Sequence, residues 1–461
     1  MTAYPFVPAL REPQGSPIRE LFKYLSDPEM ISFAGGYPSA ALFDVEGIGA
    51  ASAQALRERP AECLQYGATE GTPALRQALA ALMAERGAAV ALDELLVTSG
   101  SQQGFDFLVR ALVEPGSLVL VEEPTYSATL QALRLAGADV RGVPSDHDGM
   151  NVDALEAMLA DAPARPRMIY TVPTFANPTG ATLSPARRLQ LLELVAQHGI
   201  VLVEDDPYGA LCFDGPPPPS LLALCNQVPG ARPWLVHLAS LSKTLAPGLR
   251  LGWMVAAPEI VRRAVIAKQV SDLCTPPWLQ LTAAHYLQAG NLPAQVGREV
   301  AVYRDKRDRL TTALRQAFGT RIRFADPAGG MFLWVSVDGI DDAAALLPHA
   351  IAEKVLFVPG AGFYAERRAP RVPAVVRGRR SGADRGRRGA ACPGRGACRG
   401  IRHQSGLSQA LRYRACRRSR TRPASSHRTG GCLRDAGAPA APPPLRPWQP
   451  QSPLPADRQV R

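Results

Sequence analysis

Short apolar runs alternate along the chain with segments in which apolar residues recur at helical spacing. The runs predict strands at residues 94–98, 118–121, 167–171, 200–204, 235–238 and 253–256. Between them, residues 102–113 and 185–198 have the periodicity of amphipathic helices. Strands that alternate with helices predict an α/β fold, in which a mostly parallel sheet is covered by helices on both faces.

The pattern changes after about residue 277. A long helical segment runs to Phe318, followed by the strand-like GGMFLWVSV and a helix that ends near Glu353. We therefore predict a large domain over residues 46–280 and a smaller α+β domain over residues 281–370. The segment 1–45 is predicted to join the smaller domain or to line the cleft.

The C-terminal tail, residues 371–461, differs from the rest in composition. It contains 21 arginines, no lysine and three acidic residues, for a net charge of +18, whereas residues 1–370 carry −7. Its Arg, Gly and Pro residues cannot bury enough apolar surface to offset the entropy of ordering, so we predict disorder. A basic arm that binds nucleic acid is the alternative, but we expect no nucleic-acid partner.

Several classes of protein are disfavoured. No run of 18 or more apolar residues occurs, and the start MTAYPFVPALREPQ lacks the basic end and apolar run of a signal peptide. We therefore predict a cytoplasmic protein without a membrane partner. The eight cysteines do not follow the spacing of a metal site, so no metal is predicted.

The segment SLSKTLAPGLRLG, residues 240–252, follows a predicted strand. A buried lysine can lose its proton and attack a carbonyl, which makes Lys243 a candidate for a covalent cofactor link. Ser240, Ser242 and Arg250 can supply hydrogen-bond donors and positive charge to a phosphate. A lone lysine after a strand is more often solvated, so the neighbours are what favour a site.

Three further segments carry candidate site residues. VTSGSQQ places Ser101 and Gln102 at a helix start, where free backbone N–H groups attract phosphate. GIVLVEDD places Asp205 at the carboxyl end of a predicted parallel strand, where ligands bind in open α/β sheets. Asn177, in the turn NPTG, follows another strand at that edge. Taken singly, these features also fit an N-cap, an acidic loop and a plain turn.

Taken together and in this order, the four motifs resemble the class I/II aminotransferases of PLP fold-type I, nearest the 2-aminoadipate/kynurenine aminotransferase branch. The resemblance covers about residues 16–370. It implies a seven-stranded sheet in the large domain and pyridoxal 5'-phosphate (PLP) as cofactor. It also implies transfer of the amino group of 2-aminoadipate, an aromatic or an aliphatic amino acid to a 2-oxo acid such as 2-oxoglutarate. A PLP-dependent lyase or decarboxylase of the same fold is the alternative.

By this resemblance, Lys243 matches the lysine that forms a Schiff base with PLP and moves a proton between the substrate α-carbon and C4'. Asp205 matches the partner of the pyridine nitrogen. The other cofactor matches are Asn177 and Tyr208 for the phenolic oxygen, Tyr126 for stacking on the ring, and Ser101, Gln102, Ser240, Ser242 and Arg250 for the phosphate.

The resemblance also implies substrate contacts from Arg19, Gly36, Tyr66 and Asn177. Tyr66 matches a tyrosine lent by the neighbouring subunit, which implies a homodimer with shared active sites. Arg19 as a plain surface arginine, and Tyr66 as a core aromatic residue, remain the alternatives.

The chain departs from the family after FVPGAGFY. Family members continue with a strand of the type LRLS, whose arginine pairs with the substrate α-carboxylate, but this chain reads APRVPAVVRGRRSGADR. The stretch RVPAVVRGRRSGAD can be encoded so that the +1 frame reads ASLRLSVVAEAEQI. We hypothesise a single-base shift near Arg371. It predicts weakened amino-acid binding and a smaller domain that lacks its last strand and helix.

Overall fold

The computed structural model describes residues 4–11, 21–365 and 374–377. By its contacts the chain divides into Met1–Cys416 and Arg417–Arg461, and all described residues belong to the first unit. The predicted substrate residue Arg19 and the predicted disorder of the tail beyond residue 377 therefore lie outside the described residues.

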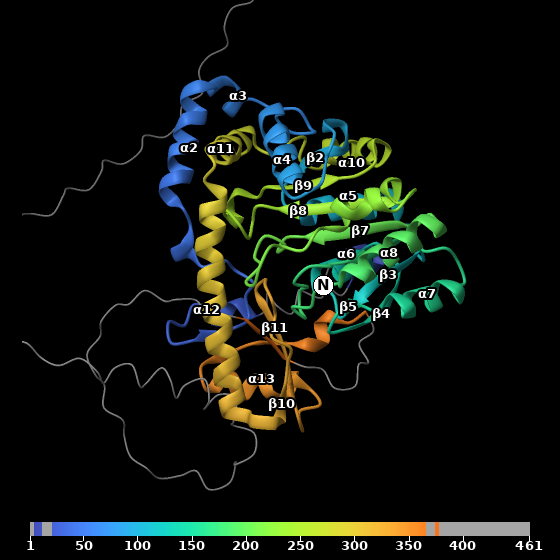
Figure 1. Cartoon of the computed structure of the whole chain (residues 1–461), viewed down its shortest axis with the longest axis vertical. Coiled ribbons are helices and arrows are strands. Elements are labelled where there is room, and N and C mark those ends of the chain that lie inside the picture. Colours follow the sequence, from blue (N-terminus) through green and yellow to red (C-terminus); the bar gives the residue numbers. More distant parts are fainter. Residues whose placement is uncertain (1–3, 12–20, 366–373, 378–461) are drawn as a thin grey trace, which may run out of the picture. The chain divides into compact units, whose positions relative to one another are not determined.

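A central eight-stranded sheet organises the described chain (Figure 1). In spatial order its strands are β2 (Leu95–Thr98), β9 (Gly252–Val255), β8 (Leu235–Ser240), β7 (Val201–Asp206), β6 (Met168–Thr171), β3 (Leu118–Glu123), β4 (Asp139–Asp146) and β5 (Gly149–Met150). Neighbouring strands from β8 to β4 are parallel, whereas β9 and β5 are antiparallel to their neighbours. All six predicted strands are present. The sheet exceeds the expected seven strands because β5 adds a two-residue antiparallel pairing to the end of β4.

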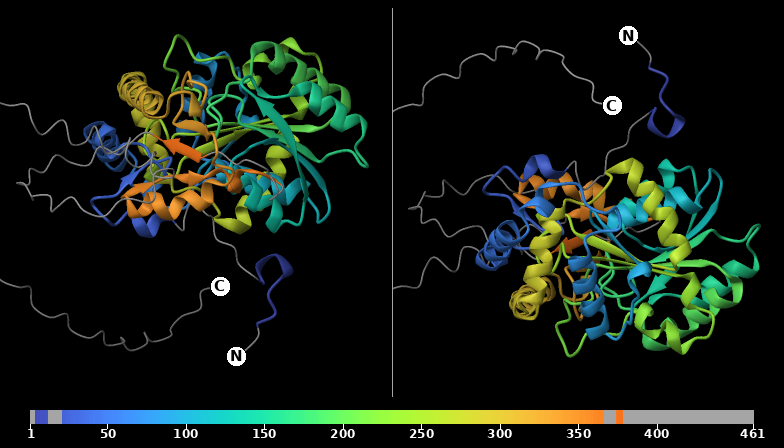
Figure 2. Two further views of the ribbon diagram at one scale, coloured as in Figure 1. Left: turned by 90° about the horizontal axis from the view of Figure 1, so that it is seen from below. Right: turned by 90° about the horizontal axis from the view of Figure 1, so that it is seen from above.

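Helices cover both faces of this sheet (Figure 2). Leu118 and Leu120 of β3 belong to one apolar core, and Val119 and Val121 belong to the other, because successive side chains of a strand point to opposite faces. The first core includes residues of α4 (Pro73–Glu85), α7 (Val152–Ala160), α8 (Pro185–His198) and α9 (Leu221–Leu224), and the second includes residues of α5 (Ser101–Leu112), α6 (Ser127–Leu135) and α10 (Pro258–Ser271). Burial on both faces explains why the strands read as continuous apolar runs.

Helix α8 has the bounds that the sequence predicts. The side chain of Ser184 accepts a hydrogen bond from the Arg187 N–H, and Pro185 occupies the first turn. Gly199 ends the helix in the left-handed conformation, with φ of 62°. The predicted helix 102–113 is α5, shifted by one residue at each end.

A smaller sheet is formed by the C-terminal part of the described chain. Its order is β10 (Ile322–Arg323), β11 (Phe332–Val337), β14 (Ala374–Arg377) and β13 (Val358–Pro359). Helices α12 (Leu292–Phe318) and α13 (Ala343–Ala352) belong to the same region. Strand β1 (Ile31–Ser32) pairs with β12 (Val355–Leu356), which links the N-terminal segment to this smaller region.

The predicted long helical segment consists of two helices. Helix α11 (Pro277–Gln288) ends in a turn where Gly290 has a φ of 72°, and α12 begins at Leu292. Helix α11 packs against α2 (Val45–Glu58), α3 (Pro60–Leu64) and α4. Figure 1 shows α12 running from the region of the large sheet to that of the small sheet.

Strand β14 corrects one prediction. We expected no strand after Pro370, yet Ala374–Arg377 pairs with both β11 and β13, and Arg377 lies opposite Phe332. The sequence Ala-Val-Val-Arg contains two β-branched residues, which favour a strand whatever their origin.

Candidate active site

The candidate residues follow the ends of the parallel strands. Strands β2 and β8 are both antiparallel to β9, so they run in the same direction as β7, β6 and β3. The carboxyl ends of these five strands therefore meet at one edge of the sheet. The predicted residues that follow or end these strands are Ser101, Ser240, Asp205, Asn177 and Tyr126.

Lys243 lies in the turn after β8 and is half-buried. Its Nζ donates a hydrogen bond to the carbonyl oxygen of Gly36, at 2.8 Å. Gly36 comes from the segment between β1 and α2, more than 200 residues earlier in the chain. The structure thus brings the predicted covalent residue and one predicted substrate residue into direct contact.

Strand β7 ends in three consecutive buried acids that have different partners. Glu204 accepts hydrogen bonds from the backbone N–H groups of Leu221 and Leu222 and lies 2.7 Å from Nδ1 of His237. Asp206 pairs with Arg86 at 2.8 Å. Burial alone would raise the pKa of Asp206, but the charges of Arg86 and other cations hold it below its ordinary value. These two carboxylates are bound by the protein itself.

Asp205 is the exception among the three. Its Oδ2 accepts a hydrogen bond from the Tyr170 hydroxyl at 2.8 Å, but its buried Oδ1 has no partner in the part of the chain that the structure describes. Burial raises the pKa of Asp205 to about 6, and the bond from Tyr170 opposes that rise. The Oδ1 of Asn177 is likewise buried without a partner among the described residues. Such orphaned atoms point to a polar ligand, because buried polar groups are ordinarily hydrogen-bonded.

The loop between β2 and α5 approaches Arg250 closely. Gly100 has a φ of 89°, and a Cβ there would lie 2.7 Å from Nη2 of Arg250. That Nη2 donates to the carbonyl of Ser99 at 3.0 Å. Gly252 is equally constrained, because a Cβ would lie 2.5 Å from the backbone N of Ser101. Only glycine permits this approach, which sets helix α5's N-terminus beside an arginine.

Ser240 and Ser242 lie on the other side of this loop and bond to each other. The Ser240 hydroxyl lies 2.8 Å from Oγ of Ser242 and 3.1 Å from the carbonyl of Leu251. The backbone N–H of Ser242 donates to Oγ of Ser240 at 3.0 Å. The predicted phosphate residues Ser101, Ser240, Ser242 and Arg250 are thus grouped around one loop. Gln102 is exposed on the first turn of α5.

The predicted aromatic residues differ in environment. Tyr208 is buried, and its ring meets that of Phe332 edge-on at 5.2 Å. Tyr126 is half-buried before the first turn of α6. Tyr66 is 78% exposed, so within this chain it is not a core residue.

Sequence reasoning missed two buried groups beside Asp205. Tyr170 is the residue that hydrogen-bonds Asp205. Glu122 accepts bonds from the Thr171 hydroxyl and the Val172 N–H, and burial raises its pKa to about 7, with the nearby charge of Asp205 adding to the rise. Both lie near the end of an apolar run. A polar side chain at that position is the only feature of the sequence that could have indicated them.

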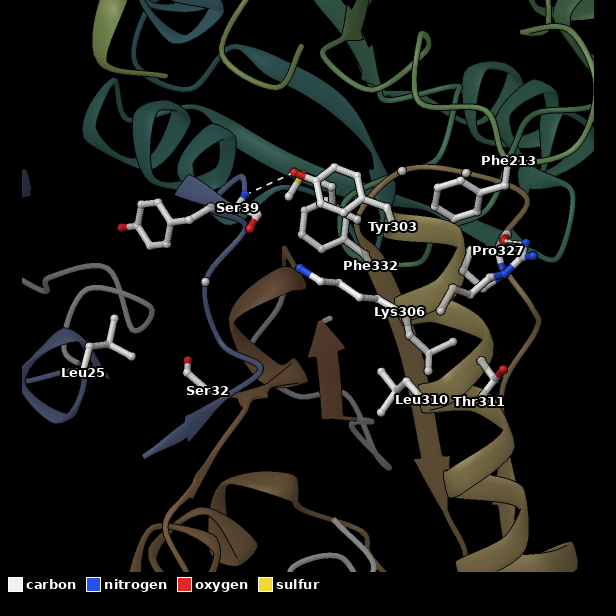
Figure 3. A pocket seen from close by; sticks show the side chains of 17 residues that line it. Leu25, Ser32, Ser39, Phe213, Tyr303, Lys306, Leu310, Thr311, Pro327 and Phe332 are labelled. Carbon is white, nitrogen blue, oxygen red and sulfur yellow. Dashed lines mark hydrogen bonds between the residues drawn. The ribbon is translucent and has the colours of Figure 1, made fainter. Parts of the chain in front are cut away.

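A cavity lies beside the segment that carries Gly36 (Figure 3). It lies between the 35–39 segment, helix α12 and residues 327–333. Gly35 and Tyr37 line it on either side of Gly36. Figure 3 shows the Lys306 side chain directed into the cavity beneath Tyr303 and Phe332. Tyr303 accepts a hydrogen bond from the Ser39 N–H at 3.2 Å.

Nowhere in residues 4–11, 21–365 and 374–377 do three His, Cys, Asp or Glu side chains gather as metal ligands. In the same part of the chain, every helix is too short or too polar to cross a membrane.

Comparisons with known proteins agree with this geometry. The family model described as aminotransferase class I and II matches residues 34–377. The chain is 38% identical to aromatic-amino-acid aminotransferase 1 of Thermococcus litoralis, over 77% of this chain and 85% of the relative. It is 39% identical to the 2-aminoadipate transaminase of Thermus thermophilus, over 76% of this chain and 86% of that relative. The crystal structure of Pyrococcus horikoshii kynurenine aminotransferase, solved with PMP, matches with a TM-score of 0.76 at 36% identity and covers 81% of this chain and 92% of that one.

Proposed function

Because the chain belongs to the class I and II aminotransferases and is a PLP-dependent enzyme that transfers amino groups, we propose that Lys243 is the residue that binds PLP covalently. The observation that carries this proposal is the pair of orphaned buried oxygens, on Asp205 and Asn177, at the strand edge where Lys243 lies. The Oδ1 of Asp205 can accept from the protonated pyridine nitrogen, and the amide of Asn177 can donate through its NH2 group to the phenolic oxygen.

The residues of this chain fit the cofactor group by group. When bound, PLP supplies an electron sink that stabilises negative charge at the substrate α-carbon. Asp205 holds the pyridine nitrogen protonated through its open Oδ1, and Tyr170 fixes its other oxygen. Asn177 and Tyr208 bond the phenolic oxygen, and Tyr126 stacks on the ring. The phosphate is held by Ser101, Gln102, Ser240 and Arg250, and Ser242 contributes through its hydrogen bonds with Ser240.

Lys243 also moves the proton that the reaction requires. With PLP bound, the amine of Lys243 would be placed to carry a proton between the substrate α-carbon and C4'. The carbonyl of Gly36 accepts a hydrogen bond from the Nζ at 2.8 Å and so orients the amine. Lys243 therefore serves first as the covalent anchor and then as the acid and base.

We further propose how substrates bind. Gly36, Asn177 and Arg19 contact the amino acid, and Tyr66 reaches the active site of a second subunit in a homodimer. The 78% exposure of Tyr66 supports its placement at an interface. The cavity's aromatic walls and the Lys306 ammonium suit both aromatic and acidic side chains, the two classes that the relatives' names indicate. A cytoplasmic location remains a prediction from the sequence.

The altered C-terminus is proposed to weaken this activity. A frame shift near Arg371 would remove the arginine of the LRLS strand that pairs with the α-carboxylate, a strong bidentate contact. The nucleotide sequence tests this directly, since it must read LRLS in the +1 frame. Restoring that frame is expected to lower the KM for the amino acid by at least tenfold.

Absorbance spectra test the proposed function. We expect purified protein with PLP to show the visible-edge band of the lysine-bound cofactor, and glutamate to shift it. The Lys243→Ala variant is expected to lose the band and at least 10⁴-fold in activity, while exposed Lys23→Ala keeps both. A band that persists in Lys243→Ala contradicts the assignment.

Product analysis distinguishes an aminotransferase from the alternative, a PLP-dependent lyase or decarboxylase. An aminotransferase forms glutamate from 2-oxoglutarate in step with the consumption of the donor. A lyase or decarboxylase consumes the amino acid without forming glutamate, and that outcome would overturn the proposed reaction.

A further inference from the structure

A fully buried lysine that the proposed reaction does not use lies next to residues 99–103, the turn between β2 and α5 together with the first turn of α5. We call these residues the phosphate loop. Lys268, on α10, has a side chain that is 0% exposed. Its Nζ lies within 3.0 Å of Oε1 of Gln103, both carboxylate oxygens of Asp272 and Oγ1 of Thr275. Burial lowers the pKa of Lys268, and the bond to Asp272 opposes that change. A buried charge is costly unless it is fully paired, so this arrangement calls for a reason.

The partners of Lys268 hold the phosphate loop. Oε1 of Gln103 accepts from the Ser99 N–H at 2.8 Å, and Asp272 accepts from the Ser99 hydroxyl at 3.0 Å and from Nε2 of Gln103 at 2.8 Å. The carbonyl of Ser99 accepts a third hydrogen bond, from Nη2 of Arg250 at 3.0 Å. Ser99 is therefore fixed through its N–H, its hydroxyl and its carbonyl, one residue before the glycine that sets the approach to the phosphate.

The same network reaches the loop that carries Tyr66. The Thr275 carbonyl accepts from Nε2 of Gln280 at 2.6 Å, and Oε1 of Gln280 accepts from the Thr72 N–H at 2.7 Å. Lys268 thus lies at the junction of the phosphate loop, the 272–275 turn and the segment before α4.

We propose that Lys268 is a positioning residue that holds the Ser99–Gln103 loop in the conformation that binds the cofactor's phosphate. Through Gln103 and Asp272 it orders the loop during folding, so that phosphate binding does not have to order it. This inference rests on the proposed function, because it presumes that PLP occupies the site.

Cofactor titration tests this role. PLP and pyridoxal differ only in the phosphate, so full-length apoprotein is titrated with each, and the dissociation constants are read from absorbance. In Lys268→Met we expect the constant for PLP to rise about tenfold or more and that for pyridoxal to change less than twofold. Asp272→Asn, which is partly exposed and keeps its shape, is expected to raise the PLP constant about threefold, again without affecting pyridoxal.

The matched control is Lys354→Met, which breaks another Lys–Asp pair, with Asp27, outside this network. It is expected to leave both constants unchanged. If Lys268→Met and Asp272→Asn both fold and bind PLP as wild type does, or weaken PLP and pyridoxal equally, Lys268 has only a structural role. If wild type binds neither compound, the proposed function fails instead.

Discussion

The two ends of the candidate cofactor site differ in how their polar atoms are satisfied. At the phosphate end, Ser99, Ser240 and Arg250 already bond to the protein. At the ring end, buried oxygens of Asp205 and Asn177 have no partner within the described chain. One end is prebuilt, and the other carries buried oxygens that a bound ligand can satisfy.

This difference separates two tasks. A rigid phosphate end lowers the entropy lost on binding and fixes where the cofactor lies. Unsatisfied buried oxygens at the ring end make the apoprotein less stable. Their hydrogen bonds would form only when the cofactor ring is bound, and the electronic properties of that ring determine the chemistry. Changes at the ring end should therefore affect turnover, and changes at the phosphate end should affect cofactor affinity.

The largest expected effect is that of Asp205→Asn on turnover. Asparagine keeps the shape and the bond from Tyr170 but cannot hold the pyridine nitrogen protonated. We expect kcat/KM to fall about 10²- to 10³-fold, measured with saturating PLP. Asp206→Asn, one residue away, should lose stability through its Arg86 pair while changing kcat/KM less than tenfold. Equal losses in the two variants would refute the distinction between them.

The same substitution should stabilise the apoprotein. The pKa of Asp205 is about 6 in the folded state, against an ordinary value of 3.8, because burial disfavours the charged form. The protonated carboxyl therefore contributes its full stabilisation below pH 4, and this stabilisation is lost as the pH rises through 6. Removing the charge is expected to raise the free energy of unfolding by about 3 kcal/mol at pH 8. Urea denaturation at pH 8 and pH 4 measures this, and the gain should vanish at pH 4.

Arg250→Gln sharpens the comparison from the phosphate end. Loss of the guanidinium removes the bond to the Ser99 carbonyl and the charge-assisted contact to the phosphate that we propose. We expect the dissociation constant for PLP to rise at least tenfold, with kcat at saturating PLP within threefold of wild type. Arg263→Gln, on the exposed face of α10, is the control. A large fall in kcat would mean that Arg250 acts on the chemistry itself.

The sequence points to candidate residues whose signal is local, and it gives no signal for residues whose contacts depend on strand register or on distant segments. Asp205 and Lys243 stand at strand ends, which an apolar run followed by polar residues reveals. Tyr170 reaches Asp205 only because β6 and β7 align Tyr170 with Val203, and no pattern in either strand specifies that register. Lys268 was missed because its link to the β2–α5 turn runs through Gln103, which lies 165 residues earlier in the chain. The expectation of no strand after Pro370 was wrong because strand propensity is also local and does not depend on the family motif.

The smallest expected effect distinguishes direct from indirect phosphate contacts. In Ser242→Ala, Ser240 keeps its bond to the Leu251 carbonyl and still accepts from the backbone N–H of residue 242. We therefore expect the PLP dissociation constant to rise only two- to threefold. Ser240→Ala removes the oxygen on which both bonds depend, and it should raise the constant about tenfold. If Ser242→Ala proves as harmful as Ser240→Ala, Ser242 binds the phosphate directly, and the phosphate end is less completely prebuilt than its hydrogen bonds indicate.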